Sequence, residues 1–216
     1  MQVIWATSTA LDAGFVMKLR KALAKFGGKV SVKAAPIKTI PRMRNKLADE
    51  ADHALKKRPR PMHNIDTVRA GVVVNDASIM EEVFDVIGKE VGPWLRVKNN
   101  YREACDASES NGYRALLGNL KYESGLTCRE LFGHRAWDDL WGTLPAHGDR
   151  ERLYRAVEVL RQDVMADVPV NIAAEVQLIY KPYVERTLPV PLPLPLLLPP
   201  TATTTTTTSS TATTTN

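Results

Sequence analysis

The stretch from 172 to 180, with the sequence IAAEVQLIY, constrains the fold more than any other part of the chain. Successive side chains of a β-strand point to opposite faces, so the apolar residues of this stretch share one face while Glu175 and Gln177 share the other. An ionised carboxylate is costly to bury without partners. The strand is therefore expected in a sheet whose second face is either solvated or a site that uses the charge.

Helical and strand-like patterns alternate along the rest of the chain. Apolar residues recur at helical intervals over 9–26 and 41–57, and Ser78 and Glu81 have the spacing of a capping box that opens a helix through residue 87. Strands are predicted in IDTVRAGVVVND (65–76), WLRVK (94–98) and YRALLGNLKY (113–122). This interleaving predicts an α+β (mixed α/β) fold, in which helices flank one mixed sheet.

The chain divides into a folded body at 1–187 and a tail at 188–216. Prolines alternate with leucines at the start of the tail, and a threonine tract without charge follows, so we expect a polyproline-like spacer and a disordered end. Within the body, residues 123–170 are predicted to be a helical insertion that includes a helix at 149–165. Such an insertion is expected at an edge of the sheet, because loops there tolerate extra length.

Composition narrows the class of protein. The 216 residues are 44% hydrophobic, which suits a soluble domain with a core, and the net charge of +5 suits an anionic ligand such as a nucleotide. Cys105 and Cys128 lack metal-ligand spacing and cannot form a disulfide framework, which favours a reducing compartment. Without an apolar run of about 20 residues or a secretory signal, a cytoplasmic, intracellular protein without membrane contact is expected.

Two carboxylates are the candidate catalytic and metal-binding residues. Asp66 stands at the entry of the valine-rich strand and Glu175 lies within the strand at 172–180. Two acids on neighbouring strands, with basic residues on a flanking helix, can hold Mg²⁺ against phosphate groups. Metal ions and lysine or arginine side chains supply most of the stabilisation in phosphoryl and pyrophosphoryl transfer.

Four motifs, in this order, resemble the synthetase domain of the RelA/SpoT alarmone synthetases. They are PIKTIPRMRNKL, IDTVRAGVVV, RVKNNYREACDASESNGYRALL and AEVQLIY, and they extend from residue 36 to 180. The match is nearest to divergent small members of that family. The resemblance implies a nucleotidyltransferase-like mixed sheet and transfer of pyrophosphate from ATP to the 3′-hydroxyl of GDP or GTP, with Mg²⁺ as cofactor.

The resemblance also implies roles for single residues. Asp66 would bind Mg²⁺, and Glu175 would either contact the metal or activate the acceptor hydroxyl. Tyr113 would stack on guanine, and Gln177 would orient the acceptor or hold Glu175. The remaining implied substrate-binding residues are Lys38 and Lys46 for the ATP phosphates, Asn111 and Gly112 for the shape of the tyrosine loop, and Lys98 and Arg114 for the acceptor phosphates.

Departures from the family pattern leave alternatives open. The family's first arginine falls on Pro36, its arginine in the metal strand falls on Gly71, and its histidine after Gly-Tyr-Arg falls on Leu117. Arg69 alternates onto the same face as Gly71 and is a candidate substitute. A catalytically degenerate nucleotide-binding protein is therefore one alternative. Pyrophosphate transfer to the 3′ end of tRNA is another, with residues 56–60 as the basic surface.

Overall fold

A computed structural model describes residues 1–49, 55–102, 113–133 and 150–186. Its centre is a five-stranded sheet in the order β1-β2-β5-β4-β3. The strands are β1 (Val30–Ala34), β2 (Val68–Val74), β3 (Trp94–Asn99), β4 (Leu116–Thr127) and β5 (Pro169–Tyr180). Strands β2 and β5 are parallel and the other neighbours are antiparallel, so the predicted mixed sheet is confirmed.

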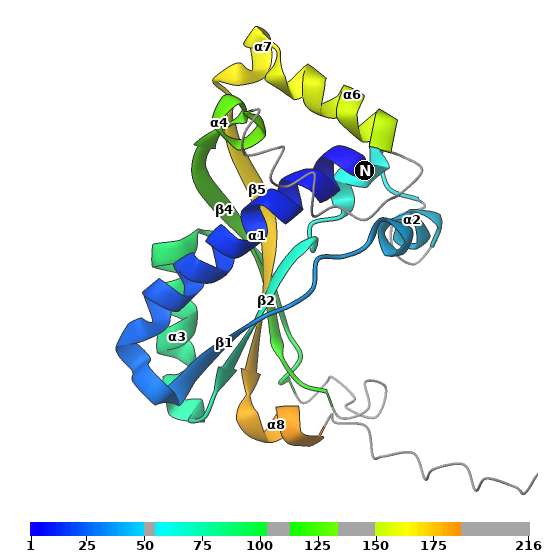
Figure 1. Cartoon of the computed structure of the whole chain (residues 1–216). Helices are drawn as coiled ribbons and strands as arrows, with labels where there is room; N and C mark the ends of the chain where they lie inside the picture. The colour runs from blue at the N-terminus through cyan, green and yellow to red at the C-terminus, as the bar shows by residue number, and fades with distance from the viewer. Residues whose placement is uncertain (50–54, 103–112, 134–149, 187–216) are drawn as a thin grey trace, which may run out of the picture.

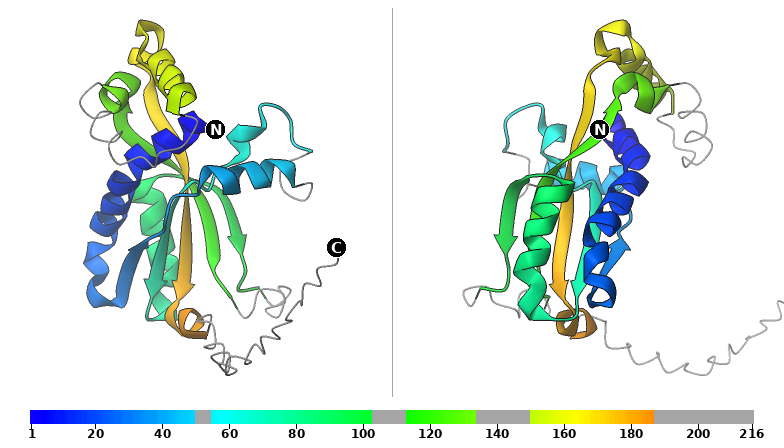
Figure 2. Two further views of the ribbon diagram at one scale, coloured as in Figure 1. Left: turned by 45° about the vertical axis from the view of Figure 1, so that its right-hand side comes forward. Right: turned by 90° about the vertical axis from the view of Figure 1, so that its left-hand side faces the viewer.

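One face of the sheet is covered by helices α1 (Gln2–Leu23) and α3 (Met80–Val86), which lie beside each other against the strands (Figure 2, right). The helices bury Phe15, Leu19 and Val83 against alternate strand residues such as Val72 and Val176. The apolar side chains at alternate strand positions therefore form the core on this side of the sheet, as the pattern at 172–180 predicts. We call the opposite side, onto which Arg69, Asn119, Glu175 and Gln177 project, the polar face.

Helix α1 begins earlier than the predicted 9–26 and ends at Leu23 in a short 3-10 segment, η1 (Ala24–Lys29). The extra N-terminal turns are held because Ala6 and Ser8 are fully buried. The following strand β1 was not predicted. It is short, and it is held by antiparallel pairing with β2, a contact between distant residues that a local pattern does not contain.

The predicted helix at 41–57 is shorter in the structure. Helix α2 (Ile40–Ala48) begins as expected, with Pro41 in its first turn and Thr39 as the cap, but it ends before Asp49, whose backbone is extended. Only Ile40 and Met43 of this helix are buried, and Leu55 is 83% exposed, so among the described residues the apolar stripe is buried only in the first turns of the helix. A 3-10 turn, η2 (Arg60–His63), precedes β2, and residues 50–54 lie outside the described part.

The capping box predicted for Ser78 and Glu81 is wrong. Asp76 is the cap instead, since its Oδ1 accepts bonds from the amide and hydroxyl of Ser78, at 2.9 and 2.8 Å. A 3-10 turn, η3 (Ala77–Ile79), then leads into α3, which continues as a π-helical turn, η4 (Ile87–Val91). An aspartate carboxylate can take both donors at once, which explains why it displaces the predicted box.

The segment predicted as an insertion at 123–170 connects two central strands. Strand β4 extends to Thr127 and β5 begins at Pro169, so strands occupy both ends of that range. Between them lie α4 (Cys128–Phe132), α6 (Arg150–Arg161) and α7 (Asp163–Ala166), grouped at one end of the sheet (Figure 1). Leu131, Phe132 and Val157 belong to the same buried cluster as the sheet, so α4 and α6 contribute side chains to the common core.

The described chain ends with α8 (Lys181–Arg186), directly after β5. The predicted disordered tail at 188–216 lies outside the described residues, as do Trp137 and Trp141 of the connecting segment. Among the described helices, none has the length and apolar character needed to cross a membrane.

Candidate functional site

The strand registers bring the polar residues of three strands onto one face. Glu175 of β5 lies between Arg69 of β2 and Asn119 of β4, its Cα partners on the two sides. Two residues further along β5, Gln177 lies between Gly71 and Leu117. Residues in register on adjacent strands point to the same side of a sheet. Glu175 is therefore at the centre of the polar face, on the strand that occupies the middle of the sheet.

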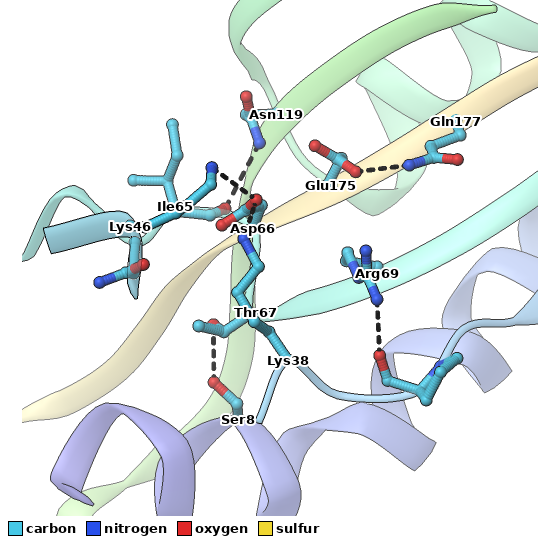
Figure 3. A network of polar contacts seen from close by, with 12 residues as sticks. Ser8, Lys38, Lys46, Ile65, Asp66, Thr67, Arg69, Asn119, Glu175 and Gln177 are labelled. Atoms are coloured by element: carbon cyan, nitrogen blue, oxygen red, sulfur yellow. Dashed lines mark hydrogen bonds and ion pairs between the residues drawn. The ribbon is translucent and has the colours of Figure 1, made fainter. Parts of the chain in front are cut away.

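Asp66 reaches this face from the segment that precedes β2. Thr67 is bent and fully buried, and its Oγ1 accepts a 2.7 Å bond from Ser8 of α1, on the covered side of the sheet. On the other side, Asn119 Nδ2 donates to the carbonyl oxygen of Ile65 at 3.3 Å. Because Asn119 is also the register partner of Glu175, it ties the Asp66 segment to the face that carries Glu175. Figure 3 shows the two carboxylates in one view, Asp66 with its two lysines and Glu175 with Gln177.

Two lysines pair with a single oxygen of Asp66. Lys38, which is almost fully buried, donates to Asp66 Oδ2, and Lys46 of α2 lies 3.2 Å from the same atom. Burial alone would raise the pKa of Asp66, but the hydrogen bond and charge of Lys38, with those of Lys46, outweigh it and lower the pKa. Burial lowers the pKa of Lys38 in spite of its bond to Asp66. The predicted phosphate-binding lysines are thus brought together, and both contact the predicted metal-binding aspartate.

A hydrogen-bonded series orients Glu175 from the other side. The hydroxyl of Tyr113 donates to Gln177 Oε1 at 2.8 Å, and Gln177 Nε2 donates to Glu175 Oε1 at 2.7 Å. Burial, followed by the nearby charges of Glu175 and Tyr101, raises the pKa of Tyr113 to about 12. Tyr113 therefore keeps its proton at neutral pH and fixes the amide of Gln177 so that its NH₂ group points at the carboxylate.

The other predicted residues differ in what they contact. Arg69 Nη2 donates to the carbonyl oxygen of Pro36 at 3.0 Å, while its Nε is buried and has no partner among the described residues. Arg114 Nη1 donates to the backbone oxygens of Asn100 and Arg102. Lys98 is exposed on the edge strand β3, where Leu117 is its register partner. Asn111 and Gly112 lie outside the described residues.

Sequence reasoning missed Asn119 and the Ser8–Thr67 pair. Asn119 is only 8% exposed and lies in the apolar first part of β4, residues 116–120, which is the same signal that identified Glu175 and Gln177. Its partner, Ile65, is 54 residues away, and Ser8 is 59 residues from Thr67. The polarity of Asn119 could have been noticed in the sequence, but its partner could not.

The donor set at Asp66 fits a magnesium ion. Asp66 Oδ1 is buried and makes no hydrogen bond to any described residue, although Oδ2 of the same carboxylate contacts two lysines. The described residues contain no cluster of three or more His, Cys, Asp or Glu side chains suited to a metal. Mg²⁺ is usually held by one or two carboxylates together with substrate phosphates, so Asp66 and Glu175 match the ion's needs when a nucleotide is bound.

No family model matches the chain, and no curated protein sequence matches it either. Solved structures do match. Small alarmone synthetase 1 from Bacillus subtilis, bound to its product pppGpp, has a TM-score of 0.50 and 8% identity, over 81% of this chain and 69% of that one. Small alarmone synthetase 2 from Bacillus subtilis has a TM-score of 0.48 and 16% identity, over 83% of this chain and 70% of that one.

A GTP pyrophosphokinase family protein from Streptococcus pneumoniae has a TM-score of 0.44 and 16% identity, over 79% of this chain and 62% of that one. The similarity to the pppGpp-bound structure agrees with the resemblance found in the motifs from residue 36 to 180. At this identity the comparison concerns the fold and not the chemistry. The chain has the fold of the small alarmone synthetases.

Proposed function

We propose that this protein is a pyrophosphotransferase that moves the β,γ-pyrophosphate of ATP to the 3′-hydroxyl of GDP or GTP. The observation that carries the proposal is the pair of carboxylates, Asp66 and Glu175, tied to one face of the sheet by Asn119 and accompanied by two lysines. Solved proteins of the same fold include one bound to pppGpp, a product of this kind. Both substrates are intracellular nucleotides, so we place the protein in the cytoplasm.

The donor nucleotide binds where β2 begins. Asp66 and Glu175 are the residues that would hold Mg²⁺, which when bound supplies positive charge against the phosphate oxygens. Lys38 and Lys46 then exchange part of their contact with Asp66 for the triphosphate. Arg69 has a donor, Nε, that is buried without a partner in the described chain, and it turns that donor to the same phosphates. These cations stabilise the negative charge that builds up on the transferred group.

The acceptor lies over Gln177 and towards β3, with Tyr113 against its guanine and with Lys98 and Arg114 near its phosphates. Its 3′-oxygen attacks the β-phosphorus of ATP, and the hydroxyl proton passes to Glu175. The bond between the β-phosphorus and the α–β bridging oxygen breaks, and AMP leaves. Gln177 keeps the carboxylate of Glu175 turned towards the hydroxyl, since it holds Oε1 at 2.7 Å.

Two alternatives each have an observation in their favour. Binding without turnover is favoured by Pro36, which offers only a backbone carbonyl where the family pattern has an arginine and which engages Arg69. Transfer to the 3′ end of tRNA is favoured by the basic stretch at 56–60, whose residues 56–59 are exposed beside α2.

Incubation with ATP labelled in its γ-phosphate, with either GDP or bulk tRNA and Mg²⁺, separates these possibilities. Labelled guanosine polyphosphate, lost in the Glu175→Gln variant, is the expected result. We expect slow turnover, because Pro36 removes one phosphate contact. Labelled RNA would replace the proposal by tRNA modification, and nucleotide binding without either product would replace it by a binding role. If neither nucleotide binds at millimolar concentration, the whole proposal fails.

A further inference from the structure

Neither packing nor backbone conformation in the described structure requires a glycine at position 71, in the interior of β2. A Cβ atom at Gly118 would come within 2.2 Å of the Trp94 ring, and one at Gly92 within 1.9 Å of the Lys121 carbonyl oxygen, so packing explains these glycines. At Gly71 the nearest atoms to such a Cβ are those of Lys33, at 3.9 and 4.0 Å, and the backbone has no positive φ. A glycine in a strand interior costs stability, and it often marks a place where a ligand comes close to the backbone.

Lys33 lies directly beside this glycine. It is the Cα partner of Gly71 in the antiparallel pair of β1 and β2, so it projects onto the polar face. Its neighbours Val30 and Val32 pack against the core on the other side of the sheet. The side chain of Lys33 is exposed, and its ammonium makes no hydrogen bond or ion pair with any residue in the described part of the chain.

Three cations near the β1–β2 side of the polar face already have acceptors. Lys38 and Lys46 contact Asp66, and Arg69 donates to the carbonyl of Pro36. Lys33 thus carries a positive charge without an acceptor among the described residues. Its strand lies one strand spacing, about 4.8 Å, from the backbone of Gly71 and two spacings, roughly 10 Å, from Gln177. Lys98 belongs to the opposite edge of the sheet, four strand spacings or roughly 19 Å away. Lys33 therefore lies on the donor side of Glu175 and Lys98 on the acceptor side.

We propose that Lys33 and the bare backbone at Gly71 form an anion subsite on the polar face, which takes the polyphosphate chain of the donor nucleotide. This inference rests on the proposed function, because the donor must lie on the Asp66 side of the sheet. The missing side chain lets the phosphates approach β2 closely, and the ammonium of Lys33 closes over them from β1. Neither residue contacts Asp66 or Glu175, so the subsite adds affinity without changing the carboxylates.

Calorimetry on Lys33→Gln, in the presence of Mg²⁺, tests the subsite with two probes, a non-hydrolysable ATP analogue and inorganic tripolyphosphate. We expect the Kd of both probes to rise about tenfold, the usual effect of losing one charge-assisted contact, while the Kd of GDP stays unchanged. The control is Lys29→Gln, which removes the same charge from an exposed lysine just before β1.

A charge-conserving variant sharpens the test. Lys33→Arg keeps a cation at the same position of β1 and leaves Gly71 unchanged, so it should retain most of the affinity for tripolyphosphate. If Lys33→Gln binds both probes as well as Lys29→Gln does, Lys33 only protects the edge strand from pairing, and the inference is overturned while the proposed function stands. Wild-type protein that binds tripolyphosphate through Lys33 but not the ATP analogue would keep the subsite and overturn the proposed function. Failure to bind either probe would overturn both.

Discussion

The two carboxylate oxygens of Asp66 have different surroundings. Its Oδ2 contacts two ammonium groups, and its Oδ1 is buried without a partner among the described residues. The aspartate therefore stabilises the fold through the lysines and also presents an oxygen that a metal could use. Removing the charge should affect both properties, since it would leave Lys38 buried beside a neutral group.

We expect Asp66→Asn to lower the free energy of unfolding by about 3 kcal/mol, the usual cost of leaving one member of a buried pair alone. It should also abolish the Mg²⁺-dependent part of ATP binding. Urea denaturation and calorimetry measure the two effects. Asp85→Asn, the same substitution at an exposed position of α3, should change neither. Unchanged stability of Asp66→Asn would show that the lysines do not depend on this carboxylate.

Tyr113 contributes its hydroxyl to Gln177 and, in the proposed function, its ring to the guanine. Two substitutions separate these contributions. Tyr113→Phe keeps the ring, so we expect kcat to fall about tenfold with little change in the KM for GDP, as for other residues that orient a catalytic group. Tyr113→Ala should raise that KM as well. A rise in KM of equal size in both variants would contradict the separate roles.

The titration of Tyr113 predicts a change in stability at alkaline pH. Its pKa rises from 10.0 to about 12 on folding, so between these values the folded protein binds the proton more tightly than the unfolded chain. The stabilisation is complete below pH 10 and is lost as the pH rises towards 12. Burial raises the pKa of Tyr101 and Tyr122 as well, so all three tyrosines contribute to the fall in the unfolding free energy of the wild-type protein at alkaline pH. Tyr113→Phe should make the decline in unfolding free energy shallower, and an identical decline in both proteins would contradict the assignment.

At the scale of elements, strands β2, β3, β4 and β5 could be predicted because runs of β-branched and apolar residues are a local signal. Strand β1 could not, because its five residues are held by pairing with β2. The same distinction applies to the site. Asp66, Glu175 and Gln177 could be identified as polar residues in or beside apolar strands, whereas the role of Asn119 depends on a partner that only the folded chain brings near. The extent of α2 was overestimated because helical periodicity continues beyond the residues that find a buried partner.

Strand β4 contains the most demanding glycine among the strands. Trp94 stacks on Phe84, with ring centroids 4.6 Å apart, and its Nε1 donates to the Phe84 carbonyl, so the ring cannot move aside for a methyl group at Gly118. We expect Gly118→Ala to lower the free energy of unfolding by about 3 kcal/mol. Gly71→Ala, with nothing to meet, should change it by less than about 1 kcal/mol. Thermal denaturation compares the two variants, and equal effects would contradict the packing of Trp94.

At the scale of the whole molecule, the sheet, α1 and the β4–β5 connection share one core. The sequence predicts a helical insertion at an edge of the sheet, because the helical pattern lies between two strand patterns. Leu131, Phe132 and Val157 are buried in the same cluster as the sheet, which favours a connection that is part of the common core over a separate insertion. The connection therefore contributes to the stability of the body that holds the site.

Phe132→Ala tests this shared core. The side chain is 1% exposed, so we expect a loss of about 3 to 5 kcal/mol in the free energy of unfolding, with a single cooperative transition in urea. Val159→Ala, at a position of α6 that is 53% exposed, should have little effect. A small loss at Phe132, or a separate early transition for the connection, would favour an independent insertion.

In the proposed function, the polar face binds a metal and a nucleotide through Asp66 and Glu175. Anomalous diffraction from crystals of the protein grown with Mn²⁺, a non-hydrolysable ATP analogue and GDP tests this binding directly. We expect an anomalous peak in contact with the carboxylates of Asp66 and Glu175, next to the phosphates of the analogue. A nucleotide bound elsewhere on the molecule, with the metal touching neither carboxylate, would contradict it.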